Sequence, residues 1–363
     1  MNTVVTHRRE QVSLTRSDWP LVSVIVVNYN GGERLPSCLE SLASDTYPAQ
    51  QIVVVDNAST DDSRTILNNF TRLHREITVL WSARNLGYAG AVNLGLGSTE
   101  GEFIAVLNMD VTVERGWLKP LVRVFESRPE IAAVNPLIVL ADGKGINAAG
   151  QDIHITGLGF NRGLGELASS IDGEPFSVSG IQGGAFLIRR TLLEKIGGMD
   201  TTGFLYHEDV NLSWLLRLMG FHFCCVPESV VHHDYFLTMY PAKLHLLERN
   251  RWSMLLAYLR RPSLMLLSPA LLMTEILMWC YCFVRGTGFL QAKIESYRWI
   301  LQHWPQIKTR RRIAESLRVV SDWKVLKNLH WMYAFGQFAT LGRERGASRR
   351  QPVGGLPKEV VND

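Results

Sequence analysis

Short runs of β-branched residues alternate with longer amphipathic runs over the first 110 residues of this chain. The sequence predicts four strands and three intervening helices there: strands at 22–28, 52–55, 77–81 and 103–107, and helices at 34–43, 63–74 and 91–97. Strands that alternate with helices favour a parallel sheet covered by helices. The first 110 residues are therefore expected to form a βαβαβαβ half of an α/β domain.

The composition changes beyond this half, toward Gly-rich loops and shorter strands. In order, the sequence predicts a helix at 117–127, loops and short strands through 147–184, a strand at 185–188, a helix at 191–196, a helix that begins just after Glu208-Asp209, and a strand at 226–231. The loop-rich stretch is where a subdomain that shapes an acceptor site would lie. No internal repeats are present.

Composition limits the class of protein. With 363 residues, 46% of them hydrophobic and 20% charged, the chain can bury a sizeable core in one domain or two. Five cysteines without framework spacing predict reduced thiols in a cytosolic protein. No apolar run before Trp19 suggests a secretory signal.

Positive charge gathers toward the C-terminus. Between Arg285 and Arg350 there are fourteen Lys and Arg against four Asp and Glu. We find no nucleic-acid motif and no basic stripe interleaved with aromatic residues, so nucleic acid is not an expected partner. Basic residues beside an apolar segment suit an anionic membrane surface better, although basic ends are often simply solvated.

The apolar segment at 263–284 is nearly uninterrupted, but it contains Pro269 and Glu275. A single span needs about 20 apolar residues, and a Glu near its centre would cost about 2.5–3.5 kcal/mol. A helix or hairpin lying in the membrane interface is therefore favoured over a full span or a buried core helix. Trp299, Trp304 and the arginines at 310–312 would suit a headgroup layer.

Polar side chains follow the first two predicted strands where each one ends. Asn28 and Asn30 follow the first strand, and Asp56 and Asn57 follow the second. Open α/β folds bind ligands at the carboxyl ends of their strands. Asp56 could accept hydrogen bonds from the imide N–H of uracil or thymine, or from ribose hydroxyls.

A Gly-rich loop, Arg84–Asn93, follows the strand at 77–81. Gly87 and its small neighbours would let the backbone approach a ligand closely, while Asn85 and Asn93 offer amide contacts. The loop is neither a Walker loop nor the glycine turn of a dinucleotide fold, so both of those folds are disfavoured.

The strand at 103–107 runs into Asn108-Met109-Asp110. A carboxylate at a strand tip can bind Mg²⁺ or Mn²⁺, and the cation would neutralise a diphosphate leaving group. Asn108 could orient a metal-bound water. His232 and His233, which follow each other after the strand at 226–231, could complete the metal shell or contact the phosphates. Neighbouring histidines are, however, more often ordinary surface or core groups. The spacing of the cysteines does not suit zinc.

Glu208 and Asp209 lie where a loop enters a helix. One of them could cap the helix, but transfer to a hydroxyl also needs a general base. We expect Asp209 to be that base and Glu208 to hold the acceptor. Further along, Arg251 lies on a predicted helix and could bind a diphosphate or a lipid-linked phosphate; a solvated helix face is the alternative.

Structural roles compete with these assignments. An ordinary turn would explain Asn30, an Asx turn would explain Asp110, and a helix N-cap would explain Asp61 or Asp62 better than Asp56. Acidic side chains at the ends of two buried strands nevertheless favour a nucleotide site.

Taken in order, five motifs resemble family-2 glycosyltransferases of GT-A fold, in the bacterial rhamnosyltransferase-like branch. They are Val24–Asn30, Val53–Asp61, Asn85–Asn93, Leu107–Asp110 and His207–Trp214. The resemblance implies a mostly parallel central sheet flanked by helices. It covers a glycosyltransferase domain at 20–255, with a nucleotide-binding half at 20–110 and an acceptor half at 111–255. Composition adds an N-terminal segment at 1–19, a helical membrane-associating extension at 256–342 and a disordered tail at 343–363.

The resemblance also implies an activity, namely inverting, non-processive transfer from a nucleoside-diphosphate sugar with Mg²⁺ or Mn²⁺. The branch suggests dTDP-rhamnose as donor and a lipid-linked or polysaccharide acceptor at the inner face of the cell membrane. A degenerate sugar-nucleotide or glycan-binding module is a rival. A nucleotidyltransferase is another, but the chain lacks a Gly-rich activation loop near residue 30.

Several residues take roles from this resemblance. Asp56 falls on the base-binding position, Asp110 on the last acid of the metal motif, and Asp209 on the catalytic base. Asn108 replaces the Asp common at the start of that motif, so a second ligand, His232 or His233, should be required. The residues expected to bind the nucleotide sugar are Asn28, Asn30, Asp56, Asn57, Asn85, Gly87, Asn93, Asn108 and Arg251.

Overall fold

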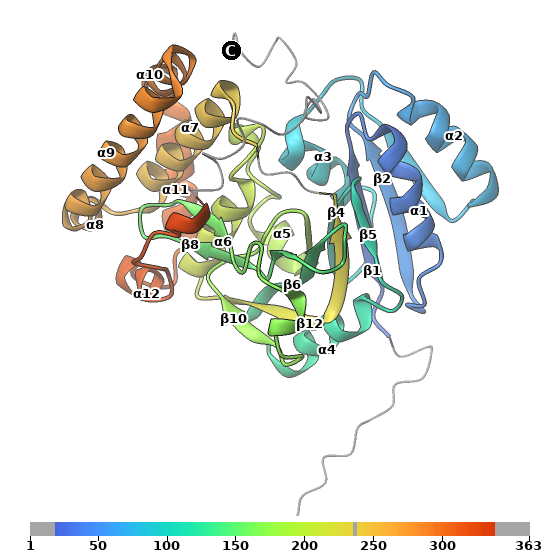
Figure 1. Cartoon of the computed structure of the whole chain (residues 1–363). Helices are drawn as coiled ribbons and strands as arrows, with labels where there is room; N and C mark the ends of the chain where they lie inside the picture. Colours follow the sequence, from blue (N-terminus) through green and yellow to red (C-terminus); the bar gives the residue numbers. More distant parts are fainter. Residues whose placement is uncertain (1–18, 235–237, 338–363) are drawn as a thin grey trace, which may run out of the picture.

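The computed structural model describes residues 19–234 and 238–337. The predicted tail at 343–363 and all but the last residue of the predicted segment at 1–19 lie outside the described residues. The described chain forms a central sheet with helices on both faces, and a group of later helices packs at one side of it (Figure 1).

The first half has the predicted order of elements. It contains β1 (Val22–Asn28), η1 (Gly32–Arg34), α1 (Leu35–Ala43), β2 (Gln50–Asp56), α2 (Ser63–Leu73), β3 (Ile77–Trp81), α3 (Gly87–Leu96) and β4 (Phe103–Asn108). Each predicted strand and helix is confirmed, and α3 begins four residues earlier than predicted.

The second half holds shorter elements, as its composition indicated. They are β5 (Val111–Val113), α4 (Leu118–Ser127), β6 (Ile131–Leu140), β7 (Ile146–Ala148), β8 (Gln151–Ile153), β9 (Gly159–Asn161), η2 (Ala168–Ser170), β10 (Phe176–Val178), β11 (Ala185–Arg189), α5 (Arg190–Lys195), η3 (Thr201–Gly203), α6 (Glu208–Leu218) and β12 (His222–His233). The strand predicted at 226–231 is the second half of β12.

The sheet has the strand order β10-β12-β6-β11-β4-β1-β2-β3. The four strands of the first half are parallel, but β11 runs antiparallel between β4 and β6. The second half is mixed, because β6 and β12 are parallel whereas β10 and β11 are antiparallel to their neighbours, so the predicted mostly parallel sheet is confirmed only in part. The chain enters β11 from an irregular loop region, and no crossover helix requires β11 to lie parallel to its neighbours.

The register places the polar strand ends together. Asn28 pairs with Asp56 across β1 and β2, and Val27 pairs with Asn108 across β1 and β4. On the other side, β5 pairs with the end of β12, so that His233 lies opposite Val111. One edge of the sheet thus carries most of the polar residues that the sequence singled out.

Two hydrophobic cores hold this edge in place. One lies between the sheet and α1, α2 and α4, and the other lies between the sheet and α3, α5 and α6 (Figure 1). Because helices cover both faces, the inner strands are apolar on both sides. All residues of β1 are buried.

The later helices are α7 (Pro241–Tyr258), α8 (Arg261–Leu266), α9 (Ser268–Arg285), α10 (Thr287–Gln302), α11 (Trp304–Leu317) and α12 (Asp322–Leu326). A third core joins α6 to α7 and α11. The apolar segment at 263–284 divides into α8 and α9, with Pro269 in the first turn of α9. Across residues 19–234 and 238–337, no helix combines the length and the apolar character that crossing a membrane requires.

Candidate active site

Asn28 and Asp56 are in contact at the ends of β1 and β2. Asn28 Nδ2 donates to Asp56 Oδ1 at 2.8 Å and to Ser59 Oγ at 3.1 Å. The main-chain N–H of Ser59 donates to Asp56 Oδ2 at 3.3 Å. A carboxylate has about four lone-pair positions, so Asp56 can still accept hydrogen bonds from a ligand.

The amide side chains of Asn30, Asn57 and Asn85 form hydrogen bonds within the loops at this edge. Asn30 Oδ1 accepts from the main-chain N–H of Thr60 at 2.7 Å. Asn57 Nδ2 donates to Asn85 Oδ1 at 2.9 Å, and Asn57 Oδ1 accepts from the main-chain N–H of Leu86 at 2.8 Å. These bonds connect the ends of β1 and β2 with the start of α3, and a role in binding stays a prediction.

Asp110 and His233 face each other beside this edge. His233 Nε2 lies 3.3 Å from Asp110 Oδ1, and His233 Nδ1 lies 3.0 Å from Asn147 Oδ1. A neutral ring that donates from Nδ1 to Asn147 would offer its Nε2 lone pair to a cation, whereas a protonated ring donates from Nε2 to Asp110. Burial disfavours the charged form of Asp110, but the hydrogen bond and charge of His233 outweigh it and hold the pKa of Asp110 below its ordinary value.

These two groups fit a divalent cation. Asp110 Oδ1 is buried and faces His233 Nε2 at 3.3 Å. Among the residues that the structure describes, no group of three or more His, Cys, Asp or Glu gathers to hold a metal. Mg²⁺ in phosphoryl sites usually takes only one or two carboxylates and completes its shell with substrate phosphates and water. Asp110 and His233 would therefore hold the cation together with the diphosphate.

His232 points away from this site. Neighbouring residues of a strand project to opposite faces, and His232 Nε2 lies 3.1 Å from Glu114 Oε1 with 31% of its side chain exposed. The choice between the two histidines, which the sequence left open, therefore falls on His233.

Arg34 is a site residue that sequence reasoning missed. Its Nε lies 2.5 Å from Asp234 Oδ2, and the main-chain N–H of Asp234 donates to Asp110 O at 3.1 Å. The charge of Arg34 also helps to lower the pKa of Asp110. An Arg beside the cation position is suited to a diphosphate oxygen.

Asp209 occupies the first turn of α6 and faces the loop before β11. Its Oδ2 accepts from the main-chain N–H of Gly183 at 3.1 Å and from Gln151 Nε2 at 3.2 Å. Burial raises the pKa of Asp209 above its ordinary value, against the opposing effect of these hydrogen bonds. A carboxylate with a raised pKa is a better proton acceptor than an exposed one.

Gly183 and Gly184 lie between Asp209 and His233. A Cβ on Gly184 would lie 3.2 Å from His233 Cε1, and one on Gly183 would lie 3.5 Å from Asp209 Cβ. The carbonyl of Gly184 accepts from the main-chain N–H of Asn108 at 3.0 Å. Two adjacent glycines just before a predicted strand are the signal that could have found this close backbone approach.

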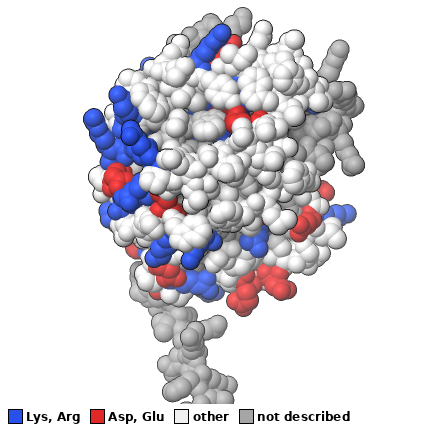
Figure 2. Space-filling model, turned by 90° about the vertical axis from the view of Figure 1, so that its left-hand side faces the viewer, with Lys and Arg blue, Asp and Glu red and all other residues white. Residues whose placement is uncertain are grey.

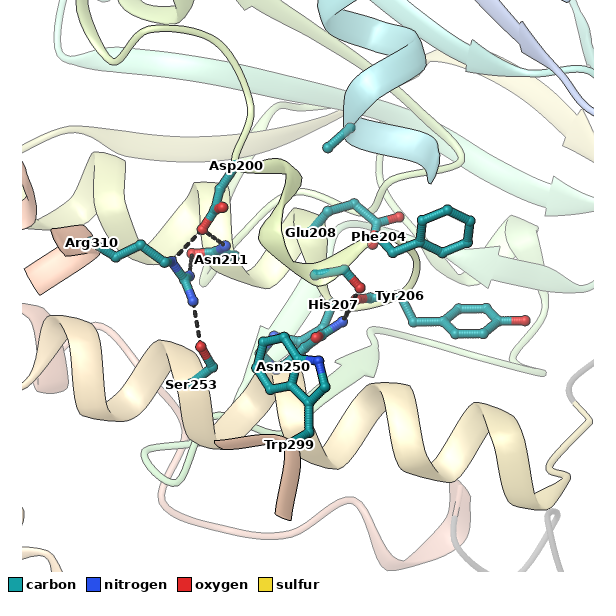
Figure 3. A pocket seen from close by; sticks show the side chains of 12 residues that line it. Asp200, Phe204, Tyr206, His207, Glu208, Asn211, Asn250, Ser253, Trp299 and Arg310 are labelled. Carbon is teal, nitrogen blue, oxygen red and sulfur yellow. Dashed lines mark hydrogen bonds and ion pairs between the residues drawn. The ribbon is translucent and has the colours of Figure 1, made fainter. Parts of the chain in front are cut away.

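Glu208 lines a small pocket together with Tyr206, His207 and Asn250 (Figure 3). Its Oε2 is buried and has no hydrogen-bond partner among the described residues. Burial and the adjacent charge of Asp209 raise the pKa of Glu208 to about 8. Its expected contact with the acceptor stays a prediction.

Arg251 lies in the interior, away from the strand ends. It is 1% exposed and forms ion pairs with Glu248 at 2.8 Å and with Glu275 at 2.7 Å. The prediction that it binds a phosphate is wrong, because carboxylates from α7 and α9 already neutralise it.

Asn93 and Gly87 take part in the packing of α3. Asn93 Nδ2 donates to Met199 O, and Asn93 Oδ1 accepts from the Met199 N–H, both at 2.8 Å. Gly87 has φ +71°, and a Cβ there would lie 2.1 Å from Phe204 O. Both residues hold the segment around 199–204 against α3, and the binding roles predicted for them stay predictions.

Residues 23–197, which contain β1–β4 and the Gly183-Gly184 pair, match the family model described as glycosyl transferase family 2. Over that region the chain is similar to this family. The match ends before α6, so it does not include Glu208 and Asp209.

Two relatives come from Mycobacterium tuberculosis. Its pre-mycofactocin glycosyltransferase is 30% identical over 239 residues, which are 65% of this chain and 46% of that protein. Its N-acetylglucosaminyl-diphospho-decaprenol L-rhamnosyltransferase is 27% identical over 236 residues, which are 59% of this chain and 76% of that protein. This chain thus spans less than half the length of the first of these relatives.

A solved structure agrees in fold. GalNAc-T7, determined with UDP, GalNAc and Mn²⁺, has a TM-score of 0.56 at 20% sequence identity, and the match covers 67% of this chain and 48% of that one. At this identity the likeness concerns the fold alone. It confirms the expected GT-A type of fold, with the mixed sheet described above.

Proposed function

We propose that this protein transfers one sugar, with inversion, from a nucleoside-diphosphate sugar to a hydroxyl of a lipid-linked or polysaccharide acceptor. The observation that carries this proposal is the placement of Asp209 and the Asp110–His233 pair on either side of Gly183-Gly184. One side offers a base for an acceptor hydroxyl, and the other offers ligands for a cation at a diphosphate.

The reaction is a direct displacement. Asp209 takes the proton of the acceptor hydroxyl while its oxygen bonds to the anomeric carbon of the donor sugar. The bond between that carbon and the diphosphate breaks, and its electron pair leaves with the diphosphate oxygen. A Mg²⁺ or Mn²⁺ ion held by Asp110 and His233 would supply charge neutralisation for that leaving group. Arg34, held by Asp234, would turn its remaining N–H groups toward that leaving group.

The nucleoside would lie against Asn28 and Asp56. Asp56 would accept hydrogen bonds from the imide of uracil or thymine or from ribose hydroxyls, while Asn28 and Ser59 hold its carboxylate in place. The mycobacterial L-rhamnosyltransferase supports dTDP-rhamnose as the first donor to test, and its name supports a polyprenyl-diphosphate acceptor.

An exposed apolar surface supports a position at the membrane. On α8 and α9 it comprises Met265, Leu266, Leu272, Met273, Ile276, Phe283 and Val284, which are 49–76% exposed. Figure 2 looks onto the side where α8, α9 and α10 lie and shows a broad area with few charged side chains, with Lys and Arg gathered along one border. Apolar burial contributes about 25 cal/mol per Å², and each basic residue near an anionic surface adds about 1 kcal/mol. We therefore propose peripheral binding at the cytosolic face, where lipid-linked acceptors are within reach.

The test is a transfer assay with purified full-length protein, Mn²⁺ or Mg²⁺, and a panel of nucleotide sugars with polyprenyl-diphosphate sugar acceptors. We expect a product one sugar larger by mass spectrometry, with inverted anomeric configuration by NMR. Nucleotide-sugar binding without turnover would instead establish a binding module. Formation of a nucleotide sugar from a sugar phosphate and a nucleoside triphosphate would establish a nucleotidyltransferase.

A further inference from the structure

Four buried charged side chains form a cluster between α7, α9 and α10. Arg251 donates to both carboxylate oxygens of Glu248 at 2.8 Å and to Glu275 Oε1 at 2.7 Å. Lys293 contacts Glu248 and lies 2.9 Å from Glu275 Oε2. Two acids and two bases thus neutralise one another, with side-chain exposures of 0–2% except for Glu275 at 16%.

Such a cluster fixes positions more than it adds stability. Removing charges from water is costly, and buried ion pairs often contribute no more than hydrophobic residues of similar size would. Their hydrogen bonds, however, have strict geometry. Such a cluster can therefore hold neighbouring segments in register.

The cluster holds the turn that connects β8 with β9. Arg251 Nη1 donates to Thr156 O at 3.1 Å, and Thr274 of α9 donates from its hydroxyl to Thr156 Oγ1 at 3.1 Å. The next residue, Gly157, has φ +81°, and a Cβ there would lie 3.1 Å from Met254 Cε. The turn is therefore pressed against α7 and tied to both α7 and α9.

The same hairpin contacts the loop that carries the base. The carbonyl of Gly157 accepts a hydrogen bond from His207 Nε2 at 2.7 Å, and Gln151 at the start of β8 donates to Asp209 Oδ2 at 3.2 Å. His207 has φ +73° and directly precedes Glu208 and Asp209. The left-handed backbone at His207 sets the direction in which α6 begins. The hairpin holds the His207 side chain in place through Gly157 O.

We propose that the Arg251–Glu275 cluster positions the catalytic loop: through the β8–β9 hairpin, α9 sets the placement of Asp209. Arg251, Glu275 and Thr274 are positioning residues, and the later helices serve catalysis as well as membrane contact. This inference rests on the proposed function, with Asp209 as base. A displacement of about 1 Å at a reacting group can lower the rate by about 100-fold.

The test compares transfer kinetics and donor binding in matched variants. Arg251→Lys keeps the charge between the two acids but cannot also reach Thr156 O. Thr274→Val removes one hydroxyl at constant shape, and Thr274→Ser restores it. Glu315→Gln, which alters ion pairs with Arg260 and Arg318 on the same group of helices, is the control. Donor dissociation constants are measured by calorimetry, and folding is followed by thermal unfolding.

We expect Arg251→Lys to lower kcat at least about tenfold and Thr274→Val to lower it less, both with an unchanged donor dissociation constant. Thr274→Ser and Glu315→Gln should retain the wild-type kcat. If Arg251→Lys does not fold, the positioning role is tested by Thr274→Val and Thr274→Ser alone: a lower kcat in the first and a wild-type kcat in the second would support it. An unchanged kcat, or equal losses of kcat, donor binding and thermal stability, would overturn the positioning role. Absence of transfer by the wild-type protein would instead overturn the proposed function.

Discussion

Asp209 accepts a hydrogen bond from the main-chain N–H of Gly183 at 3.1 Å. This contact fixes the carboxylate against the loop whose next residue, Gly184, packs on His233. Asp209, the proposed base, and His233, the proposed cation ligand, therefore contact consecutive residues of one loop. Movement of this loop would change the acceptor end and the leaving-group end of the site together.

The first prediction concerns Asp209→Asn. An amide of the same shape cannot take a proton, so transfer should fall by about 10²–10⁴-fold, the usual contribution of a general base. Donor binding, which involves the other end of the site, should stay at the wild-type level. Initial rates and calorimetric titration with the nucleotide sugar measure the two effects separately.

The matched control is Asp172→Asn, which makes the same change on an exposed loop. It should transfer sugar at the wild-type rate. Wild-type rates for Asp209→Asn would show that another group takes the proton.

The second prediction concerns stability and pH. The pKa of Glu208 is raised in the folded protein from 4.5 to about 8, so the folded state binds more protons than the unfolded state between these values. The free energy of unfolding should therefore decrease as the pH rises from about 4.5 to about 8, and the effect of Glu208 should level off above that range. Glu208→Gln cannot ionise, and its stability should vary less with pH over the same window. Urea unfolding at a series of pH values measures the difference, and equal slopes for the two proteins would contradict the shifted pKa.

Local patterns were enough to predict the parallel half of the fold. Val22–Asn28 is a short run rich in Val and Ile, and β1 has those bounds. The start of α3 was missed because its first turn contains Gly87 and Gly90, which are poor helix formers. Asn57 and Asn85 favour this start, since their side chains accept from the main-chain N–H groups of Leu86 and Gly87.

The site was only partly predictable, because some of its contacts join distant residues. Arg34 and Asp234 are 200 residues apart, and no spacing rule connects them. The pairing of Asp110 with His233 also depends on how β5 pairs with β12. Arg251 was assigned to a ligand because a sequence shows its charge, whereas the partner Glu275 belongs to a helix 24 residues further on.

The third prediction separates the two neighbouring histidines. His233→Ala removes a group 3.3 Å from Asp110, whereas His232→Ala removes one that faces Glu114. Loss of even an outer partner of a metal ligand costs about 10–100-fold in metal affinity, so His233→Ala should weaken Mn²⁺-dependent donor binding at least as much. His232→Ala should bind as the wild type does. Thermal stabilisation by Mn²⁺ and a nucleoside diphosphate measures both, and the reverse order would place the cation elsewhere.

The fourth prediction tests the membrane face. Leu272 and Ile276 lie one turn apart on α9 and are 63% and 49% exposed. Replacing both with Glu puts charge into the apolar surface and should weaken binding to anionic phospholipid vesicles at least about tenfold, since each charged group is costly to bury in hydrocarbon. Leu73→Glu, at an 83% exposed position on α2, is the control and should bind normally. Vesicle co-sedimentation measures the binding, and equal binding by all variants would exclude this face.

The fifth prediction concerns Gly87, where α3 meets the loop before α6. Its φ of +71° favours glycine, and a Cβ would lie 2.1 Å from Phe204 O, a backbone atom that cannot move aside alone. Gly87→Ala should therefore lower the free energy of unfolding by at least about 1–3 kcal/mol, the usual cost of one strained backbone conformation. Gly173→Ala, where a Cβ would meet nothing within 4 Å, should leave the free energy of unfolding nearly unchanged. Urea denaturation of the two variants measures the difference.

Because Phe204 leads toward Asp209, Gly87→Ala should also reduce transfer by more than its loss of folded protein explains. Normal transfer per folded molecule would show that the contact between Gly87 and Phe204 does not affect the placement of Asp209.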